Sequence, residues 1–155
     1  MRTTLVACAV ALALVPAAAF EAAASDKADV MATVHQFTDG LNKGDTKTAL
    51  AACAAPSSIV DEFPPYAWQG ATACADWANE FDAYNKKNGI TEPIATLGKP
   101  RHVDITGDRA YVVVPANYTY KQHGKRATES GSTLTVALQK LADGWRVTGW
   151  AWSKH

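Results

Sequence analysis

The chain has 155 residues, with 15 basic and 15 acidic side chains, so its formal net charge is zero. A chain of this length suits one domain with a proper apolar core. Its neutrality excludes nucleic acid or an anionic membrane surface as the main partner, because both require a strong basic excess.

Residues 1–24 are predicted to be a secretory signal peptide. A basic residue precedes the apolar run Leu5–Val15, and small residues follow it, which is the layout of a cleaved leader. Cleavage after Ala19 and cleavage after Ala24 both fit. The apolar run is too short to span a bilayer. We therefore expect no membrane insertion, a secreted or periplasmic location, and one domain over residues 25–155.

Two cysteines follow the leader, Cys53 and Cys74. An even pair in an oxidising compartment is typical of a disulfide, and we expect one between them. The alternative is two buried thiols that pack as small apolar side chains.

A first amphipathic helix is predicted over residues 26–41, with Ser25 and Asp26 able to cap its first turn. Gly44 can end this helix region in the left-handed conformation. Apolar side chains recur along the helix at three- and four-residue spacing, at Val30, Val34, Phe37 and Leu41.

Asp45 can cap a second short helix that is predicted to continue to Cys53 before Pro56 ends it. Residues 58–63 then have strand composition. The two prolines that follow forbid regular pairing beyond them. We therefore expect a short edge strand that leads into a loop.

A third helix is predicted over residues 71–87, and Gly89 closes it. The hydrophobic period then changes to two, which indicates an antiparallel meander of hairpins. The strands are expected at residues 101–106, 109–120, 131–141 and 145–153, with turns at Gly107-Asp108, at 121–131 and at Asp143-Gly144. Helices followed by a meander predict a single α+β domain.

Several features resemble the nuclear transport factor 2-like superfamily, which includes ketosteroid isomerases, SnoaL-like cyclases and scytalone dehydratase. They are the L-N-K-G-D junction at residues 41–45, the Asp61 strand that runs on to Gly70, and the W-R-V-T-G-W-A-W strand at residues 145–152. The resemblance covers nearly all of residues 26–155. It implies a cystatin-like cone, in which three N-terminal helices pack on a strongly curved antiparallel sheet and leave a conical pocket.

Asp61 is the best candidate for chemistry. By strand alternation it shares a face with Ile59 and Phe63, so its carboxylate faces the interior if these two are buried. A carboxylate in an apolar pocket has a raised pKa and is a better general base at neutral pH. Its spacing to Gly70 resembles that of the base in ketosteroid isomerases. The alternative is that Asp61 caps a turn or pairs with a lysine or arginine at the rim.

The resemblance places the family's two oxyanion donors at Phe37 and Ala137, and neither side chain can donate a hydrogen bond. An enolate would therefore need a substitute donor, because such stabilisation is usually the largest catalytic contribution. We do not expect steroid isomerisation. The substitute donors that the sequence offers are Tyr66, Trp77, Asn117, Thr135 and Trp152.

Aromatic side chains are predicted to line the pocket. Trp150 and Trp152 share one face of the last strand, and the resemblance implies that this face looks into the pocket. Such a pocket suits a small apolar or aromatic molecule, although tryptophans at this spacing also fill ordinary cores. The opposite wall and the mouth are assigned to Tyr66, Trp68, Trp77 and Phe81.

The sequence predicts no metal and no cofactor. His102 and Asp104 lie two apart on one strand face, but two ligands without a third do not make a site.

Two functions remain. The first is an exported small-molecule-binding domain, monomeric or a homodimer through the outer face of the sheet. The second is a cofactor-free isomerase or lyase with Asp61 as the general base. We favour the first because both family oxyanion donors are missing.

Overall fold

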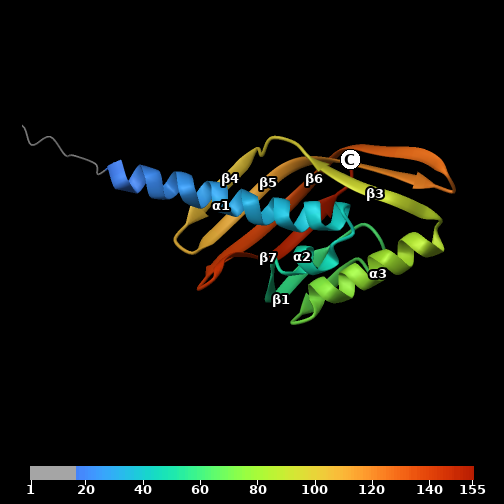
Figure 1. Ribbon diagram of the computed structural model, residues 1–155, viewed down its shortest axis with the longest axis horizontal. Helices are drawn as coiled ribbons and strands as arrows, with labels where there is room; N and C mark the ends of the chain where they lie inside the picture. The colour runs from blue at the N-terminus through green and yellow to red at the C-terminus, as the bar shows by residue number, and fades with distance from the viewer. Residues whose placement is uncertain (1–16) are drawn as a thin grey trace, which may run out of the picture.

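A long helix and two shorter ones pack against a curled seven-stranded sheet in the computed structural model, which describes residues 17–155 (Figure 1). The helices are α1 (Ala17–Asn42), α2 (Thr46–Leu50) and α3 (Ala73–Lys87). The strands are β1 (Cys53–Val60), β2 (Ala67–Gly70), β3 (Ile90–Leu97), β4 (His102–Thr106), β5 (Arg109–Gln122), β6 (Lys125–Leu141) and β7 (Gly144–Ser153). This arrangement confirms the predicted α+β class with helices on a strongly curved sheet.

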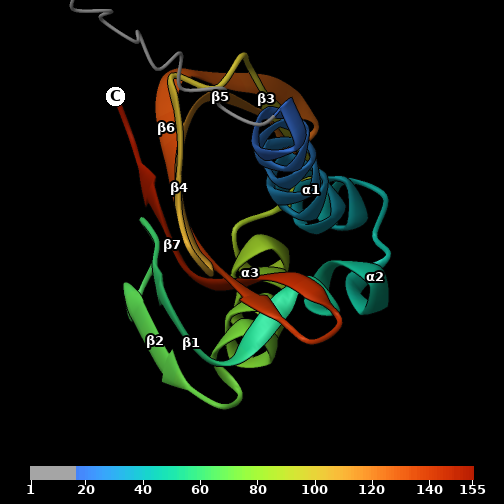
Figure 2. The ribbon, with the colours of Figure 1, turned by 90° about the vertical axis from the view of Figure 1, so that its left-hand side faces the viewer.

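The sheet is mixed, whereas the sequence predicted an antiparallel one. Its strand order is β2-β1-β7-β6-β5-β3, and β4 pairs with the first part of β5. β1 and β7 run parallel. Most of the chain separates these two strands, so no tight turn forces them into opposite directions. Figure 2 shows the sheet curving around α1 and α3.

The concave face of the sheet carries the apolar core. Val112 and Val114 of β5 pair with Val136 and Leu134 of β6, and all four side chains are buried. The predicted apolar face of α1 covers them. Its buried members are Val30, Val34 and Phe37.

α1 begins well before its predicted start at Asp26, because the alanine-rich stretch ahead of it has high helix propensity. Ser25 and Asp26 therefore lie inside the helix and do not cap it. The Asp26 carboxylate instead accepts hydrogen bonds from Lys140 Nζ at 2.6 Å and Trp145 Nε1 at 3.4 Å, which attach α1 to β6 and β7. Of the predicted signal peptide, residues 1–16 lie outside the described residues, and the leader stays a prediction.

α2 is shorter than predicted and ends at Leu50. Asp45 caps it as expected, because the Asp45 side chain accepts a hydrogen bond from Thr48 N at 3.1 Å. Gly40 allows α1 to approach α2 closely, since a Cβ at Gly40 would lie 2.8 Å from Ala49 N. The prediction that Pro56 ends the helix was wrong. Pro56 lies inside β1, where the register of the β1–β7 pair shifts, so its missing N–H breaks no regular ladder.

β1 is not the edge strand that the sequence predicted, because β2 and β7 flank it. The two prolines sit in the tight turn between β1 and β2, where they interrupt no pairing. β3 was missed. It contains Pro93 beside a register shift and lies at the edge of the sheet, which is where a strand tolerates proline. The predicted turn over residues 121–131 is a tight one at His123-Gly124.

The predicted disulfide between Cys53 and Cys74 is present and joins the start of β1 to the first turn of α3. Their Cα atoms lie 6.6 Å apart, and 21 positions separate them in the chain. Closing such a loop stabilises a fold by about 3 kcal/mol in the chain-entropy treatment. No helix among residues 17–155 is long and apolar enough to cross a bilayer.

The L-N-K-G-D junction owes its structural role largely to Asn42. Its side-chain amide donates to Ala95 O at 2.8 Å and accepts from Ala95 N at 2.8 Å, so it completes the edge of β3 and fixes the end of α1 to the sheet. Both hydrogen bonds are partly shielded from water.

We expect Asn42→Ala to lower the free energy of unfolding by about 2 kcal/mol, because two backbone groups of Ala95 lose their partner. Urea denaturation followed by circular dichroism measures this change. Lys43→Ala, at the exposed neighbouring position, serves as the control and should change the stability by less than about 0.5 kcal/mol. Equal effects of the two substitutions would contradict the role given to Asn42.

Candidate functional site

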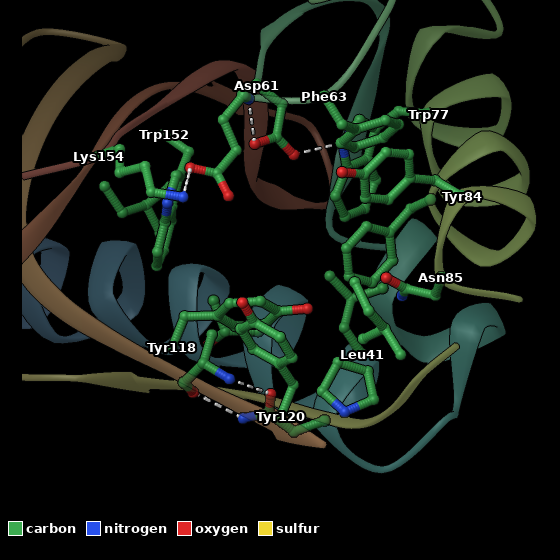
Figure 3. Close-up of a pocket in the computed structure, with 18 of the residues that line it drawn as sticks. Leu41, Asp61, Phe63, Trp77, Tyr84, Asn85, Tyr118, Tyr120, Trp152 and Lys154 are labelled. Atoms are coloured by element: carbon green, nitrogen blue, oxygen red, sulfur yellow. Dashed lines mark hydrogen bonds and ion pairs between the residues drawn. The ribbon is translucent and has the colours of Figure 1, made fainter. Parts of the chain in front are cut away.

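A cavity of about 190 Å³ lies between the concave face of the sheet, the end of α1 and α3. Figure 3 shows side chains from all of these elements around it. Nine of its 21 lining residues are aromatic. The aromatic lining residues are Phe37, Phe63, Trp77, Phe81, Tyr84, Tyr118, Tyr120, Trp150 and Trp152.

The aromatic wall is organised around Trp77 of α3. Its ring stacks on Phe81 at 5.2 Å and meets Trp150 edge-on at 4.8 Å between centroids. Phe37 of α1 contacts both tryptophans, at 5.9 Å from Trp77 and 5.8 Å from Trp150. Stacked and edge-on pairs are the favoured geometries of aromatic rings. Side chains from α1, α3 and β7 therefore pack together into one continuous wall of the cavity.

Asp61 lies at the first position after β1, and its carboxylate faces the cavity. Ile59 and Phe63 are buried, so the alternation argument places Asp61 on the interior side as expected. Oδ2 accepts a hydrogen bond from Trp77 Nε1 at 2.8 Å, and Oδ1 accepts one from Glu62 N at 2.7 Å. Within residues 17–155, no lysine, arginine or histidine forms an ion pair with it.

Burial raises the pKa of the Asp61 carboxyl group to about 6, because the apolar surroundings destabilise its charged form. The hydrogen bonds from Trp77 and from the Glu62 backbone act in the opposite direction. The negative charges of Glu62 and Glu129 add to the increase. At neutral pH the group is mostly ionised and yet basic enough to take a proton.

A charged cluster of Glu62, Glu129 and Lys154 lies beside Asp61. Lys154 Nζ is 3.0 Å from Glu129 Oε2 and 3.4 Å from Glu62 Oε2. Burial raises the pKa of Glu129, but hydrogen bonds from Ser132, Lys154 and Trp152 together hold it below its ordinary value. Glu129 is therefore ionised, and the charged cluster ties the end of β7 to β6 and to the loop after β1.

Three polar atoms on the cavity-lining residues have no hydrogen-bond partner within the described chain. They are Tyr118 Oη, Asn85 Oδ1 and Trp150 Nε1. Figure 3 shows Tyr118 and Tyr120 across the cavity from Asp61. Burial raises the pKa of the Tyr118 hydroxyl, so it stays neutral and can donate a hydrogen bond. Buried polar atoms without partners are costly, and they are the atoms that a ligand or water would satisfy.

The structure brings six of the residues named from the sequence to this cavity, namely five aromatic residues and one aspartate. They are Phe37, Asp61, Trp77, Phe81, Trp150 and Trp152.

Five other residues named from the sequence lie outside the cavity lining. Tyr66 is 56% exposed in the β1–β2 turn, and Trp68 packs behind the cavity against Phe63 at 5.0 Å between ring centroids. Asn117 is exposed and accepts a hydrogen bond from Gly131 N. Thr135 and Ala137 alternate with the buried Leu134 and Val136, so they face the outer side of the sheet.

Ala137 was therefore the wrong position for a pocket group on β6. The local alternation of Leu134, Val136 and Leu138 indicated this outer position, whereas the family resemblance placed Ala137 in the pocket. The residues that sequence reasoning missed include Tyr118 and Tyr120, which continue the buried alternation of Val114 and Ala116 along β5. That alternation was a sequence signal for side chains that face the cavity. No such signal predicted the position of Glu129, because a register shift in the β5–β6 pair places it opposite Tyr118.

His102 and Asp104 are both exposed on β4. Across residues 17–155, no group of three histidine, cysteine or acidic side chains is placed to hold a metal ion.

Comparison with known proteins identifies the fold. The sequence matches no protein-family model and no curated protein significantly. Solved structures match over most of their length. A nuclear transport factor 2-like protein with a cystatin-like fold from Novosphingobium aromaticivorans is 14% identical with a TM-score of 0.72, covering 88% of this chain and 86% of that one. The chain has the nuclear transport factor 2-like fold.

Two further structures agree. A nuclear transport factor 2-like superfamily protein from Salmonella enterica is 14% identical with a TM-score of 0.72, over 85% of this chain and 92% of that one. A ketosteroid isomerase-like protein from Erwinia carotovora is 17% identical with a TM-score of 0.66, over 83% of this chain and 95% of that one. At these identities the likeness establishes the fold, and function has to be argued from the cavity.

The raised pKa of Asp61 predicts how the free energy of unfolding depends on pH. A carboxyl group with a pKa of about 6 in the folded protein and about 4 in the unfolded chain stabilises the fold fully below pH 4. This stabilisation is lost as the pH rises through 6. Asp61→Asn does not ionise, so we expect its stability relative to the wild type to rise by roughly 2 to 3 kcal/mol between pH 4 and pH 8.

Urea unfolding at both pH values measures this difference. Asp104→Asn, on the exposed face of β4, removes the same charge outside the cavity and should show no such change. A flat pH profile for Asp61→Asn would contradict the burial of an ionised Asp61.

Proposed function

We propose that residues 25–155 form an exported domain that binds a small, mostly apolar molecule in the cavity. The observation that carries this proposal is an aromatic-rich cavity of about 190 Å³ that is lined by the partly buried Asp61 carboxylate and by three polar atoms without a partner in residues 17–155. Export is supported by the leader-like residues 1–24 and by the disulfide, which fits an oxidising compartment.

The cavity size limits the ligand. An apolar cavity of about 150 Å³ in another protein holds a benzene molecule, so this one suits a body of one or two rings. The few polar atoms around it would fix the orientation of the ligand, as in most small-molecule sites.

Tryptophan resonances offer a direct test, because the chain contains five tryptophans. We expect one- and two-ring compounds to shift the indole N–H signals of Trp77, Trp150 and Trp152 in ¹H–¹⁵N spectra. Trp68 and Trp145 lie outside the cavity lining and should move less.

Ala95 lines the cavity, so Ala95→Phe should fill it and weaken binding at least tenfold. Ala137→Phe adds the same group on the outer face and should leave binding unchanged. If no compound moves the three cavity signals, or if the two variants behave alike, the proposed site is wrong.

A second function, proton abstraction by Asp61, is favoured by the raised pKa of this carboxylate and by the neutral Tyr118 hydroxyl across the cavity. Asp61 would take a proton from a carbon next to a carbonyl group, and a tyrosine hydroxyl would donate a hydrogen bond to the developing oxyanion. Return of the proton at another carbon would complete an isomerisation. Loss of a neighbouring leaving group would complete an elimination. The likeness to a ketosteroid isomerase-like protein supports this alternative.

For this alternative, we expect the protein to accelerate exchange of the α-protons of 1-indanone in D₂O, as followed by NMR. The rate should rise with pH up to about 6 and then level off, because the base acts in its ionised form. Asp61→Asn should lower it by roughly 10²- to 10⁴-fold, while Asp104→Asn should not change it. Exchange that is unaffected by Asp61→Asn would remove Asp61 as the base.

The homodimer also stays a proposal. It is supported by exposed apolar side chains on the outer face of the sheet, with Tyr111 48% and Val60 50% exposed.

A further inference from the structure

The cavity has an excess of negative charge. The lining contains two carboxylates, those of Asp61 and Glu62, and a single ammonium group, that of Lys154. A third carboxylate, that of Glu129, is not part of the lining but contacts Lys154. Lys154 is engaged by Glu62 and Glu129, so Asp61 has no cationic partner in the described chain. An ionised carboxylate that is removed from water without a counter-ion is unfavourable. The site therefore lacks a positive charge.

The walls around Asp61 also attract cations. The faces of aromatic rings carry negative electrostatic potential, and cations bind over them, best over tryptophan. Trp77 donates to Asp61 and packs against Trp150, Phe81 and Phe37. A charged group placed next to the carboxylate would thus lie beside Trp77, in a cavity whose lining contains eight further aromatic side chains. A carboxylate with aromatic side chains is also the composition of sites that hold alkylated ammonium groups.

An independent observation comes from Asn85 on α3. Its side chain is more than nine-tenths buried, it lines the same cavity, and its Oδ1 atom has no hydrogen-bond partner in the described chain. In Figure 3, Asn85 lies on the wall that also carries Trp77 and Tyr84. An unpartnered carbonyl oxygen calls for a donor, and a protonated amine supplies N–H donors, whereas a fully alkylated ammonium group does not.

We propose that the cavity binds an organic cation, a protonated or alkylated amine on a one- or two-ring apolar body, with the charge held between the Asp61 carboxylate and the aromatic rings. This inference rests on the proposed small-molecule function and names its ligand class. The apolar body fills the space lined by Leu41, Ile90 and Leu134. An anionic ligand would meet the carboxylates unfavourably.

Binding of a cation should depend on pH, because Asp61 must be ionised to pair with it. The groups that face Asp61 are Glu62 from the same loop, Glu129 from β6, Lys154 after β7, Tyr118 from β5, and Trp77 and Tyr84 from α3. Glu129 and Lys154 stay charged above pH 6, since the pKa of Glu129 is lowered and that of Lys154 is raised. Burial also raises the pKa of Glu62, so the change near pH 6 belongs to the carboxyl groups of Asp61 and Glu62, and Asp61→Asn separates the two.

Three probes with one ring system test the proposal. They are 2-aminoindane, which is cationic at pH 7.5, 2-indanol, which is neutral and donates a hydrogen bond, and indane-2-carboxylate, which is anionic. Binding is followed by the indole N–H signals of Trp77, Trp150 and Trp152. We expect the amine to bind at least tenfold more tightly than the alcohol, and the carboxylate to bind least. Below pH 6 the affinity for the amine should fall up to tenfold per pH unit, while that for the alcohol stays constant.

Two variants and a control sharpen the test. Asp61→Asn should remove the preference for the amine over the alcohol, and Asp104→Asn, which removes the same charge on β4, should keep it. Lys154→Gln removes the competing cation and should raise the affinity for the amine about threefold or more.

The outcomes distinguish failure of the organic-cation inference from failure of the proposed small-molecule site. If the alcohol binds as tightly as the amine, or the carboxylate binds most tightly, the organic-cation inference is wrong and the small-molecule site stands. If none of the three probes moves the cavity signals, the small-molecule site itself fails.

Discussion

The hydrogen bond from the Trp77 indole to the Asp61 carboxylate is the contact on which the cavity depends. It fixes the end of β1 to α3, and the Cys53–Cys74 disulfide fixes the start of the same strand to the same helix. α3 is therefore linked to β1 at both the start and the end of that strand. Because its aromatic side chains form one wall of the cavity, these two links set the distance between that wall and the sheet. A covalent bond and a charge-assisted hydrogen bond together make this geometry resistant to collapse of the cavity.

The same hydrogen bond explains how an acidic side chain can persist among aromatic rings. Burial alone would push the pKa of Asp61 still higher, and the donors Trp77 Nε1 and Glu62 N reduce that effect. The carboxylate is thus kept ionised at neutral pH at a cost in stability. Neither donor is charged, and Lys154 is engaged by two other carboxylates. Among the described residues, Asp61 is therefore a partly buried charge without a cationic partner, and such a group indicates binding or catalysis rather than a contribution to stability.

The sequence predicted the elements with strong periodicity and the residues whose faces follow from it. The apolar spacing of α1, the aromatic face of α3 and the alternation around Asp61 reflect local geometry, so they could be deduced without the fold. Features that depend on the pairing of distant strands could not be deduced from the sequence. The parallel pairing of β1 with β7 joins distant segments. The outward position of Ala137, by contrast, follows from the local alternation with Leu134, Val136 and Leu138, which the assignment by family resemblance overlooked. The position of Glu129 opposite Tyr118 arises from a shift in the β5–β6 pair. The acidic cluster beside Asp61 was therefore visible only in three dimensions.

The two proposed uses of Asp61 place opposite demands on its pKa. A general base near neutral pH benefits from a pKa that burial has raised, because a stronger base takes a proton more readily. A cation bound beside the carboxylate would lower that pKa by direct attraction and so weaken the base. A cationic ligand therefore favours binding over proton abstraction, unless its charge lies far from the carbon that loses the proton. In a cavity of about 190 Å³ there is little room for that separation. The geometry thus couples the ligand class to the function: an organic cation points to a binding domain, and a neutral carbonyl compound leaves Asp61 free to act as a base.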